Sequence, residues 1–285
     1  MKARVGDYLL AVNGIELRAP QNPYSSFEGT AGRQTVLRLN DKPTPDGSWT
    51  VTVVPTADET DLRILGWVEG NRRLVDSLSE GRLAYVWIPD TGEDGYTYFN
   101  RYYFSQQDRH GVILDERFNH GGYIADYIID LLNRNLRGYF NNPVGDRRPW
   151  PEPMTGIFGP RVMLINEYAG SGGDALPYLF RHLKLGPLVG MRTWGGLVGI
   201  WDVPSLIDGG HITSPRGGFF DVNGKWDVEN VGIAPDIEVE QTPALLAKGR
   251  DPQLERAVAE GLRLLAEHPV ILQPEPAPPV RVRRP

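Results

Sequence analysis

Two short, continuously apolar segments each run into a glycine-rich turn and then into a helical pattern, and this repeated unit constrains the fold most strongly. The first unit joins residues 111–115 (GVILD) to the turn 119–122 (NHGG), and the second joins residues 161–166 (RVMLIN) to the turn 169–174 (AGSGGD). Apolar strands without polar alternation are typical of sheets that are covered on both faces. The sequence therefore predicts an α/β fold built from strand–loop–helix units.

Strands and helices alternate from about residue 59 onward. Apolar residues recur there at helical spacing or form short runs between turn signals. The pattern predicts helices over residues 71–80, 96–107, 123–137, 175–183 and 252–267, and strands over residues 83–89, 111–115, 161–166, 188–191 and around 218–221. Residues 141–159 are rich in Pro, Gly and Arg, which predicts a long loop.

The first 58 residues have a different pattern and are expected to form a small β-rich module. Alternating, β-branched segments indicate strands at residues 35–39 and 49–54, and residues 8–12 run into the turn dipeptide Asn13-Gly14. We therefore expect four parts: a β module over residues 1–58, an α/β domain over 59–250, a C-terminal helix over 251–268, and a disordered Pro-rich tail over 269–285.

The composition excludes several classes of protein. The chain has no cysteine, so disulfide frameworks, thiolate zinc sites and cysteine nucleophiles are ruled out. A formal net charge of -6 argues against nucleic-acid binding. No apolar run approaches the roughly 18 residues that a membrane span needs. Together with the absent cysteines, which suit a reducing compartment, this leads us to expect a cytoplasmic protein.

Ser171 lies inside the second glycine turn, directly before a predicted helix. A helix N-terminus offers unpaired backbone N–H groups and a positive dipole end, and glycines let the backbone approach a ligand closely. Such a turn can stabilise the oxyanion of an acyl-transfer intermediate. Ser171 would then supply a nucleophilic hydroxyl, with the Gly172 N–H as one oxyanion donor and the Gly121 or Gly122 N–H as the other.

The same turn is compatible with other roles. A plain structural turn is one alternative, and a phosphate-binding loop is another, although the Gly-Lys-Ser/Thr and Gly-x-Gly-x-x-Gly patterns are absent here. The hydrolase elbow Gly-x-Ser-x-Gly is broken because Ala169 replaces its first glycine. The Ser-Gly-Gly sequence also occurs in chymotrypsin-like proteases, but the flanking helical units do not suit a double β-barrel.

Longer motifs resemble the tricorn proteases, a branch of the C-terminal processing peptidase family, S41. Residues 165–174 (INEYAGSGGD) resemble the nucleophile motif of that family, and residues 115–122 (DERFNHGG) resemble its oxyanion-loop motif. Residues 192–199 (RTWGGLVG) and 228–236 (VENVGIAPD) are similar to two further motifs, and residues 5–14 (VGDYLLAVNG) resemble part of a PDZ domain. The resemblance covers residues 3 to 267 in the order of the family.

The resemblance implies a partial PDZ-like β module followed by an S41-type α/β catalytic domain that cleaves peptides. The family uses a Ser-His-Ser-Glu tetrad, in which Ser171 matches the nucleophile and Glu229 the glutamate. Gly172 and the pair Gly121 and Gly122 match the oxyanion donors. Neither a metal nor an organic cofactor is implied. The resemblance further implies peptide substrates, assembly into a homo-oligomer and cooperation with downstream aminopeptidases.

The resemblance also leaves the source of the general base open. In the family the catalytic histidine and its neighbouring serine precede the PDZ domain, whereas this sequence begins within that domain. His120, in the expected oxyanion loop, is the nearest of the five histidines, but none is assigned as the base. A serine hydroxyl without a base is a poor nucleophile, so a non-catalytic, peptide-binding or assembly subunit is the alternative function.

Substrate specificity departs from the family pattern. Tricorn proteases carry an acidic residue in the loop before the nucleophile strand, where it selects basic residues. The matching position here falls on Asn141, Asn142 or Asp146, so a preference for basic residues is not implied. The substrate-binding residues expected from the resemblance are Asn142, Asp146, Trp194 and Gly195.

Overall fold

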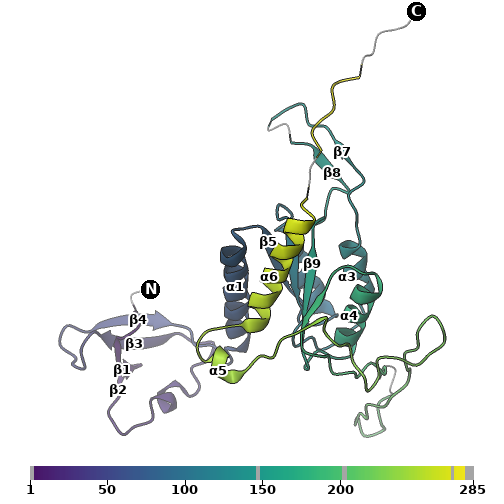
Figure 1. The fold of residues 1–285 in the computed structure, drawn as a ribbon. Helices are drawn as coiled ribbons and strands as arrows, with labels where there is room; N and C mark the ends of the chain where they lie inside the picture. Colours follow the sequence, from purple (N-terminus) through teal and green to yellow (C-terminus); the bar gives the residue numbers. More distant parts are fainter. Residues whose placement is uncertain (1–2, 146–147, 201–203, 271–272, 280–285) are drawn as a thin grey trace, which may run out of the picture. The chain divides into compact units, whose positions relative to one another are not determined.

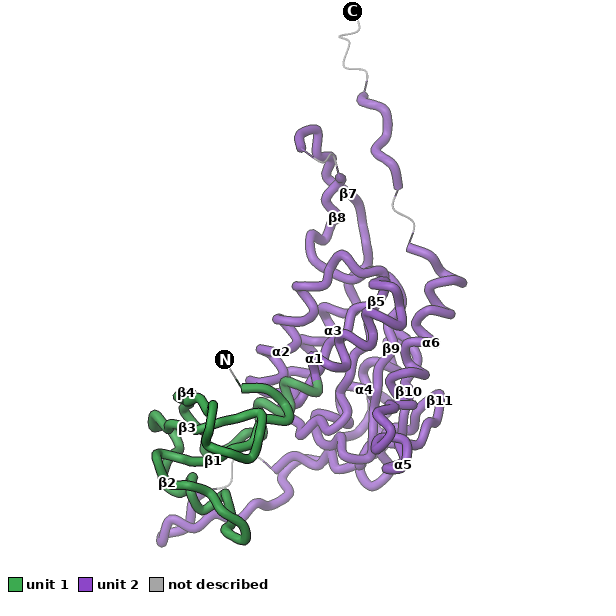
Figure 2. Tube along the Cα trace, turned by 90° about the vertical axis from the view of Figure 1, so that its left-hand side faces the viewer, with its two compact units in different colours: residues 1–67 green, residues 68–285 purple. Residues whose placement is uncertain are grey.

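The computed structural model describes residues 3–145, 148–200, 204–270 and 273–279. The chain divides into two compact units, residues 1–67 and residues 68–285 (Figures 1 and 2). The helix α1 (Thr60–Ser79) begins in the first unit and continues into the second. The division therefore falls inside a helix, some residues beyond the boundary expected after residue 58.

The first unit contains a four-stranded antiparallel sheet in the order β2-β1-β3-β4. Its elements are β1 (Tyr8–Val12), β2 (Ile15–Glu16), the 3-10 helix η1 (Pro23–Phe27), β3 (Thr35–Asn40) and β4 (Trp49–Val53). Asn13 and Gly14 connect β1 to β2, and both have positive φ angles, of 49° and 83°. A two-residue hairpin turn of this hand needs such angles, which is why Asn-Gly predicted it correctly.

The second unit is built on a five-stranded parallel sheet in the order β11-β10-β9-β6-β5. The strands are β5 (Leu83–Trp87), β6 (Gly111–Asp115), β9 (Arg161–Ile165), β10 (Leu188–Gly190) and β11 (Ile237–Glu238). Every residue of β5 and β6 is buried, as their unbroken apolar sequences predicted. The expectation of a mixed α/β fold is confirmed.

Helices cover both faces of this sheet. The helices that follow α1 in this unit are α2 (Glu93–Phe104), α3 (Ala125–Leu132), α4 (Gly172–His182), α5 (Pro243–Leu246) and α6 (Pro252–Glu267). Figure 1 shows β5 and β9 between α6 on one side and α3 and α4 on the other. Because α6 packs on β5, β6, β9 and β10, it is an integral layer of the second unit and not a separate C-terminal part.

All five strands point the same way, so their carboxyl ends lie at one edge of the sheet. The loops that follow β5, β6 and β9 therefore emerge together there. In parallel α/β sheets this edge is the usual place for a ligand or active site. Ser171 and the residue pair Gly121 and Gly122 both belong to these loops.

Besides the earlier start of α1, three further segments differ clearly from the sequence prediction. The strand expected around residues 218–221 is wrong: Phe220 forms only an isolated bridge to Trp226, and the edge strand beside β10 is β11. The expected loop 141–159 contains β8 (Trp150–Glu152), which pairs with β7 (Gly138–Phe140). The sequence did not indicate strand β8 because Pro151 lies inside it and proline is rare inside strands. The expected helix 123–137 is shorter, ending at Leu132.

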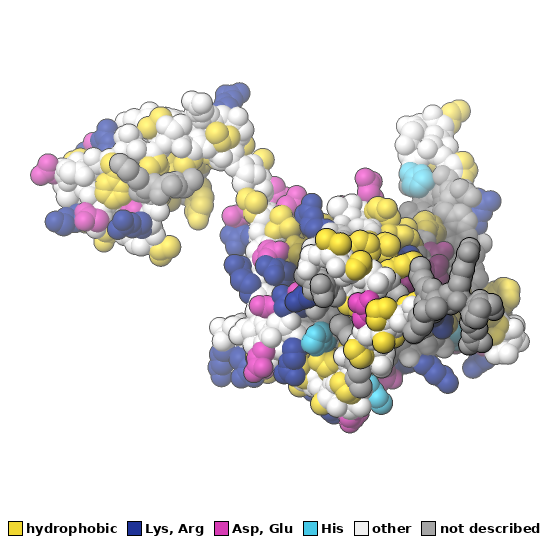
Figure 3. Space-filling view, turned by 90° about the horizontal axis from the view of Figure 1, so that it is seen from above, with side chains coloured by type: hydrophobic (Ala, Val, Ile, Leu, Met, Phe, Trp, Pro, Cys, Tyr) yellow, Lys and Arg dark blue, Asp and Glu magenta, His cyan; other side chains and the backbone are white. Residues whose placement is uncertain are grey.

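The described surface carries charges of both signs. On the face shown in Figure 3, Lys and Arg side chains and Asp and Glu side chains are both visible. None of the helices in the described ranges is long and apolar enough to cross a bilayer. In the tail, the described residues 273–279 form neither helix nor strand.

Candidate active site

Ser171 is the N-cap of α4 and stands in an unusual backbone conformation. Its φ is 57° and its ψ is -114°, a region that residues other than glycine rarely occupy. Such strain persists only where the surrounding structure enforces it, and it gathers at functional sites. The side chain is half-buried at the carboxyl edge of the sheet. Ser171 therefore stands in a backbone conformation that its surroundings must hold in place.

The carboxylate of Asp174 enforces this conformation. One oxygen, Oδ2, accepts the backbone N–H of Ser171 at 2.8 Å and that of Gly196 at 3.0 Å. The other, Oδ1, accepts the Thr193 hydroxyl at 2.5 Å and the Gly195 N–H at 2.8 Å. Asp174 is completely buried, and these four donors replace the water that it loses. One side chain thus ties the nucleophile turn to the loop 193–196.

The two glycine loops meet at Ser171. A Cβ atom on Gly121 would lie 2.7 Å from the Cβ and 3.0 Å from the Oγ of Ser171. A Cβ atom on Gly172 would lie 1.9 Å from the Thr91 Oγ1 and 2.7 Å from the backbone nitrogen of Gly122. No side chain fits at either position, so glycine is required for the close approach of the two backbones.

Gly122 and Gly172 provide the N–H groups that could bind an oxyanion. The N–H of Gly121 already donates to the Asn119 Oδ1 at 2.8 Å. For Gly122 and Gly172, by contrast, the backbone N–H makes no hydrogen bond within the described ranges. Gly172 is also the first residue of α4, where the helix dipole favours negative charge. An anion beside Ser171 would therefore meet two unused donors.

Glu229 supports the segment directly after the loop 193–196, which Asp174 holds. Its Oε2 accepts the backbone N–H groups of Leu197 and Val198, both at 2.7 Å. Glu229 lies between two residues with positive φ, Val228 at 72° and Asn230 at 60°. This tight turn aims the half-buried carboxylate at the loop that Asp174 holds. The motif residues Ser171, Glu229 and Gly172 thus belong to one connected assembly.

Trp194 and Gly195, both expected to bind substrate, occupy different environments. The Trp194 ring lies over Gly170 and Gly196 and remains 69% exposed, so it is available to a ligand. Gly195 is buried, its N–H donates to Asp174, and its carbonyl accepts the N–H of Asn230 at 2.7 Å. Gly195 therefore contacts the protein on both sides, and its backbone is not free to bind a peptide.

Asn142 is not brought next to Ser171 within this chain. It follows β7, and the β7–β8 hairpin joins α3 to the start of β9, whereas Ser171 comes after the end of that strand. Figure 1 shows the hairpin and the N-terminus of α4 at opposite ends of the second unit. Asp146, the other expected specificity residue, lies outside the described residues.

The structure does not pair Ser171 with a histidine in its described ranges. No hydrogen bond between the Ser171 Oγ and an imidazole is present there. His120 is exposed, and its backbone N–H donates to the Pro89 carbonyl. His182 stacks on Tyr178 at the last turn of α4, the opposite end of the helix from Ser171.

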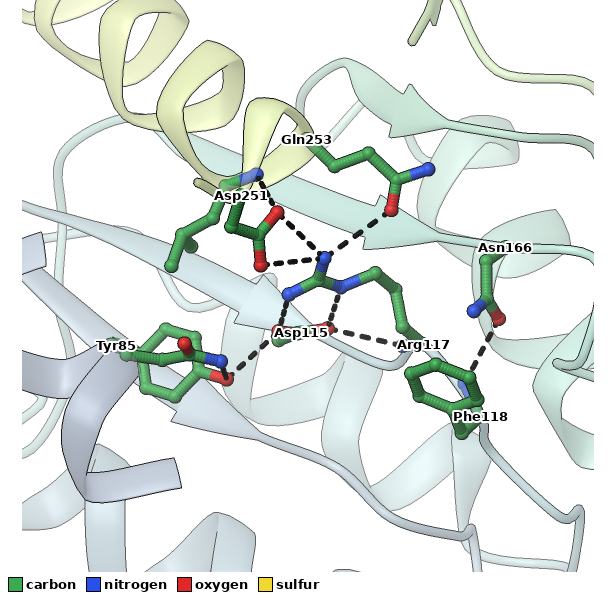
Figure 4. Close-up of polar contacts among 9 residues, drawn as sticks. Tyr85, Asp115, Arg117, Phe118, Asn166, Asp251 and Gln253 are labelled. Carbon is green, nitrogen blue, oxygen red and sulfur yellow. Dashed lines mark hydrogen bonds and ion pairs between the residues drawn. The ribbon is translucent and has the colours of Figure 1, made fainter. Parts of the chain in front are cut away.

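A buried ionic cluster anchors the loop that carries Gly121 and Gly122 (Figure 4). The Arg117 side chain is 1% exposed and donates to both Asp115 oxygens, at 2.9 and 2.7 Å. It also donates to Asp251, the N-cap of α6, at 3.0 Å and to Gln253 at 3.3 Å. Burial lowers the pKa of Arg117, but the Asp115 and Asp251 carboxylates outweigh it and hold the pKa above its ordinary value. The cluster fixes the loop to α6.

A second buried acid lies beside this cluster. Glu116 is fully buried, its Oε2 accepts the Asn119 amide N–H at 3.3 Å, and its Oε1 has no partner within the described part of the chain. Burial raises the pKa of Glu116 well above 4.5, and the charges of Asp174 and Asp115 raise it further. Glu116 supports Asn119 and, through it, the Gly121 N–H.

Sequence reasoning missed Asp174, Asn119 and Glu116 as individual site residues. One signal was available for Asp174, because a serine followed three residues later by an acidic residue before a helix is a capping-box pattern. The sequence offered no comparable signal for Glu116, since exposed and buried carboxyls look alike in a sequence. Its role follows only from the packing of the strand ends.

Comparisons with known proteins identify the relatives of this chain. The model of peptidase family S41 matches residues 82–239. The chain is 36% identical over 272 residues to the tricorn protease of Thermoplasma volcanium, which covers 95% of this chain and 26% of that protein. It is 38% identical over 274 residues to tricorn protease homolog 1 of Streptomyces coelicolor, covering 95% of this chain and 25% of that protein.

A solved structure agrees as well. The crystal structure of the tricorn protease superposes with a TM-score of 0.83 at 35% identity, over 92% of this chain and 25% of that chain. The chain thus spans about a quarter of the length of the relatives it matches. The resemblance to tricorn proteases is confirmed, and the chain belongs to peptidase family S41.

Proposed function

We propose that this chain carries the nucleophile and the oxyanion hole of a serine-type peptidase that hydrolyses oligopeptides. One observation supports the proposal above all. Asp174 holds Ser171 in a left-handed N-cap, where the loops of Gly122 and Gly172 approach closely and the N–H groups of these two glycines make no hydrogen bond in the described ranges. A hydroxyl at a helix N-terminus with available backbone N–H groups suits acyl transfer.

The proposed chemistry begins with attack of the Ser171 Oγ on the carbonyl carbon of the substrate peptide bond. The carbonyl oxygen becomes an oxyanion, which the Gly122 and Gly172 N–H groups stabilise. The hydroxyl proton passes to a base and then to the leaving amine, which leaves an acyl-enzyme on Ser171. Water, activated by the same base, attacks the acyl carbonyl and releases the carboxylic acid product.

The base is proposed to come from residues beyond the 285 of this sequence. The chain matches about a quarter of each relative, and the described ranges pair Ser171 with no histidine. Glu229 is proposed to orient that base through an intervening serine. One oxygen of Glu229 is held by Leu197 and Val198, so the carboxylate is already fixed in direction when the second oxygen meets its partner.

The absence of a paired histidine in the described ranges also supports a second candidate function. On this alternative the chain binds peptides without cleaving them, as a peptide-binding or assembly subunit of a tricorn-like complex. The two candidates differ in turnover but not in binding.

Hydrolysis of fluorogenic peptides separates the candidates. We would assay the chain alone and the chain joined to the upstream histidine-bearing segment implied by the family resemblance. Ser171→Ala should lower turnover by about four orders of magnitude or more in the joined protein. Ser77→Ala, an exposed serine on α1, is the matched control and should leave turnover unchanged. Peptide binding without any turnover in the joined protein would favour the binding subunit.

A further inference from the structure

Two exposed aromatic rings, Phe118 and Tyr168, stack on each other at the catalytic edge of the sheet. Their centroids lie 5.5 Å apart, and their planes differ by 20°. Phe118 is 45% exposed and Tyr168 is 66% exposed. Phe118 lies in the loop after β6 and Tyr168 in the loop after β9, the same two loops that meet at Ser171.

One buried side chain holds the two rings together. The Oδ1 of Asn166 accepts the backbone N–H of Phe118 at 3.0 Å and that of Tyr168 at 3.2 Å. Asn166 is 4% exposed, so water does not compete for these bonds. Figure 4 shows Asn166 directed at the Phe118 backbone, beside the buried Arg117 cluster. The pair is therefore fixed before any ligand arrives.

Phe118 is also held in a strained backbone conformation. Its φ is 67°, in the left-handed region that bulky residues avoid. The residues on either side of it, Arg117 and Asn119, are both buried and hydrogen-bonded, which turns the Phe118 ring outward. A conformation that is strained and also exposes an apolar ring has no benefit for folding. It is instead typical of ligand-contacting positions.

Both rings are within reach of a peptide bound at Ser171. Tyr168 precedes Ser171 by three residues, and Phe118 precedes Gly121, which touches the Ser171 side chain, by three residues. Three residues of extended chain span at most about 11 Å. A peptide whose scissile bond lies at Ser171 extends past this distance within about three or four of its own residues.

We propose that Phe118 and Tyr168 form a specificity-determining pair that binds an apolar or aromatic side chain of the peptide substrate. This inference rests on the proposed peptide-binding function of the Ser171 site. An incoming ring or branched aliphatic side chain covers the exposed faces and edges of the stack, and the preformed geometry limits the entropy lost on binding. Lysine peptides in the test separate this apolar contact from a cation–π contact with the same rings.

Binding without turnover tests the pair. We would use the Ser171→Ala chain and dye-labelled hexapeptides that carry Phe, Ala or Lys at each position in turn, and measure the dissociation constants by fluorescence anisotropy. At one position the Phe peptide should bind about tenfold more tightly than the Ala peptide. This preference should fall to about twofold or less in Phe118→Asn and in Tyr168→Ala.

The variants are chosen to preserve the fold. Asparagine accepts the left-handed conformation, so Phe118→Asn removes the ring without disturbing the backbone, and Phe118→Tyr should keep the preference. Trp150→Ala removes an exposed aromatic ring at the far end of the sheet and should change nothing. Unfolding midpoints of all variants confirm that they are folded.

Several results would overturn the proposal. One is a preference for Phe that survives both substitutions, and another is the absence of any position at which Phe binds better than Ala. A third is loss of self-association in Phe118→Asn, measured by sedimentation, with the peptide preference intact, since the pair would then join two copies. A different result, retained turnover in Ser171→Ala, would contradict the proposed hydrolysis. The two tests are independent because peptide binding requires no bond cleavage.

Discussion

The buried carboxylate of Asp174 accepts the backbone N–H of Ser171 at 2.8 Å and so holds the Ser171 turn in its left-handed conformation. The same carboxylate holds the Thr193 hydroxyl and the loop 195–196. Asp174 touches no reacting atom in this account. It is a positioning residue, and the geometry of the whole site depends on it.

Replacement of Asp174 tests this dependence. In Asp174→Asn an NH2 group replaces one carboxylate oxygen. The four groups around it are all hydrogen-bond donors and cannot accept its N–H groups, so we expect a loss of about 2–3 kcal/mol in the free energy of unfolding. Peptide turnover should fall through kcat, because the turn that presents Ser171 is released. Urea unfolding and steady-state kinetics measure the two effects. Asp130→Asn, at an exposed position on α3, should match the parent protein in both.

Arg117→Met should destabilise the second unit by about 3–5 kcal/mol, because Asp115 and Asp251 would be left buried without their partner. Denaturant titration followed by circular dichroism measures the loss. Arg137→Met removes an exposed arginine near β7 and serves as the control. Equal stability of the two variants would show that the cluster does not anchor the loop.

Gly172→Ala should abolish turnover. Its Cβ would lie 1.9 Å from the Thr91 Oγ1 and 2.6 Å from the Gly122 carbonyl oxygen, so the two loops must separate. Gly138→Ala, in open space at β7, provides the matched control. Fluorogenic peptide assays compare the pair. Activity of Gly172→Ala within a factor of about two of the control would contradict the close approach of the loops as a requirement for catalysis.

Glu116 makes stability depend on pH with a defined sign. Its folded-state pKa is raised above the ordinary 4.5, by burial first and then by Asp174 and Asp115. The folded chain therefore holds a proton that the unfolded chain releases. This bound proton contributes most to the free energy of unfolding below the unfolded-state pKa of Glu116. As the pH rises from there toward the raised folded-state pKa, the contribution falls by about 1.4 kcal/mol per pH unit.

Glu116→Gln removes this dependence. The free energy of unfolding of the variant, relative to the parent protein, should increase as the pH rises from 5 to 8, as urea titrations at each pH would measure. Glu240→Gln changes an exposed glutamate and leaves the buried acid in place, so its difference from the parent should stay constant. A constant difference for Glu116→Gln as well would show that Glu116 does not titrate as described.

Local signals predicted the parts of the fold in which sequence and packing agree. The Asn13-Gly14 hairpin, the buried strands β6 and β9, and the Ser171 turn were all found this way. The start of α1 was missed because Gly66 and Gly70 weaken its helical pattern. The two-residue strand β11 is too short to leave any periodicity.

The sequence predicted only part of the candidate site, because contacts between distant segments leave no local signal. Ser171, Gly172 and Glu229 stand in motifs that can be read from the sequence. The burial of Glu116 and the convergence of four donors on Asp174 arise from contacts between segments far apart in the chain. The family resemblance also led us to expect Asn142 in the site, but within this chain the β7–β8 hairpin lies at the opposite end of the sheet from Ser171.

Covalent labelling identifies the nucleophile most directly. We would treat the chain joined to the histidine-bearing segment with an organophosphonate and locate the adduct by peptide mass spectrometry. We expect one adduct, on Ser171. A competing peptide should slow its formation, and Ser171→Ala should abolish both the adduct and turnover. An adduct on a different residue that abolishes turnover while Ser171 stays unmodified would contradict this expectation.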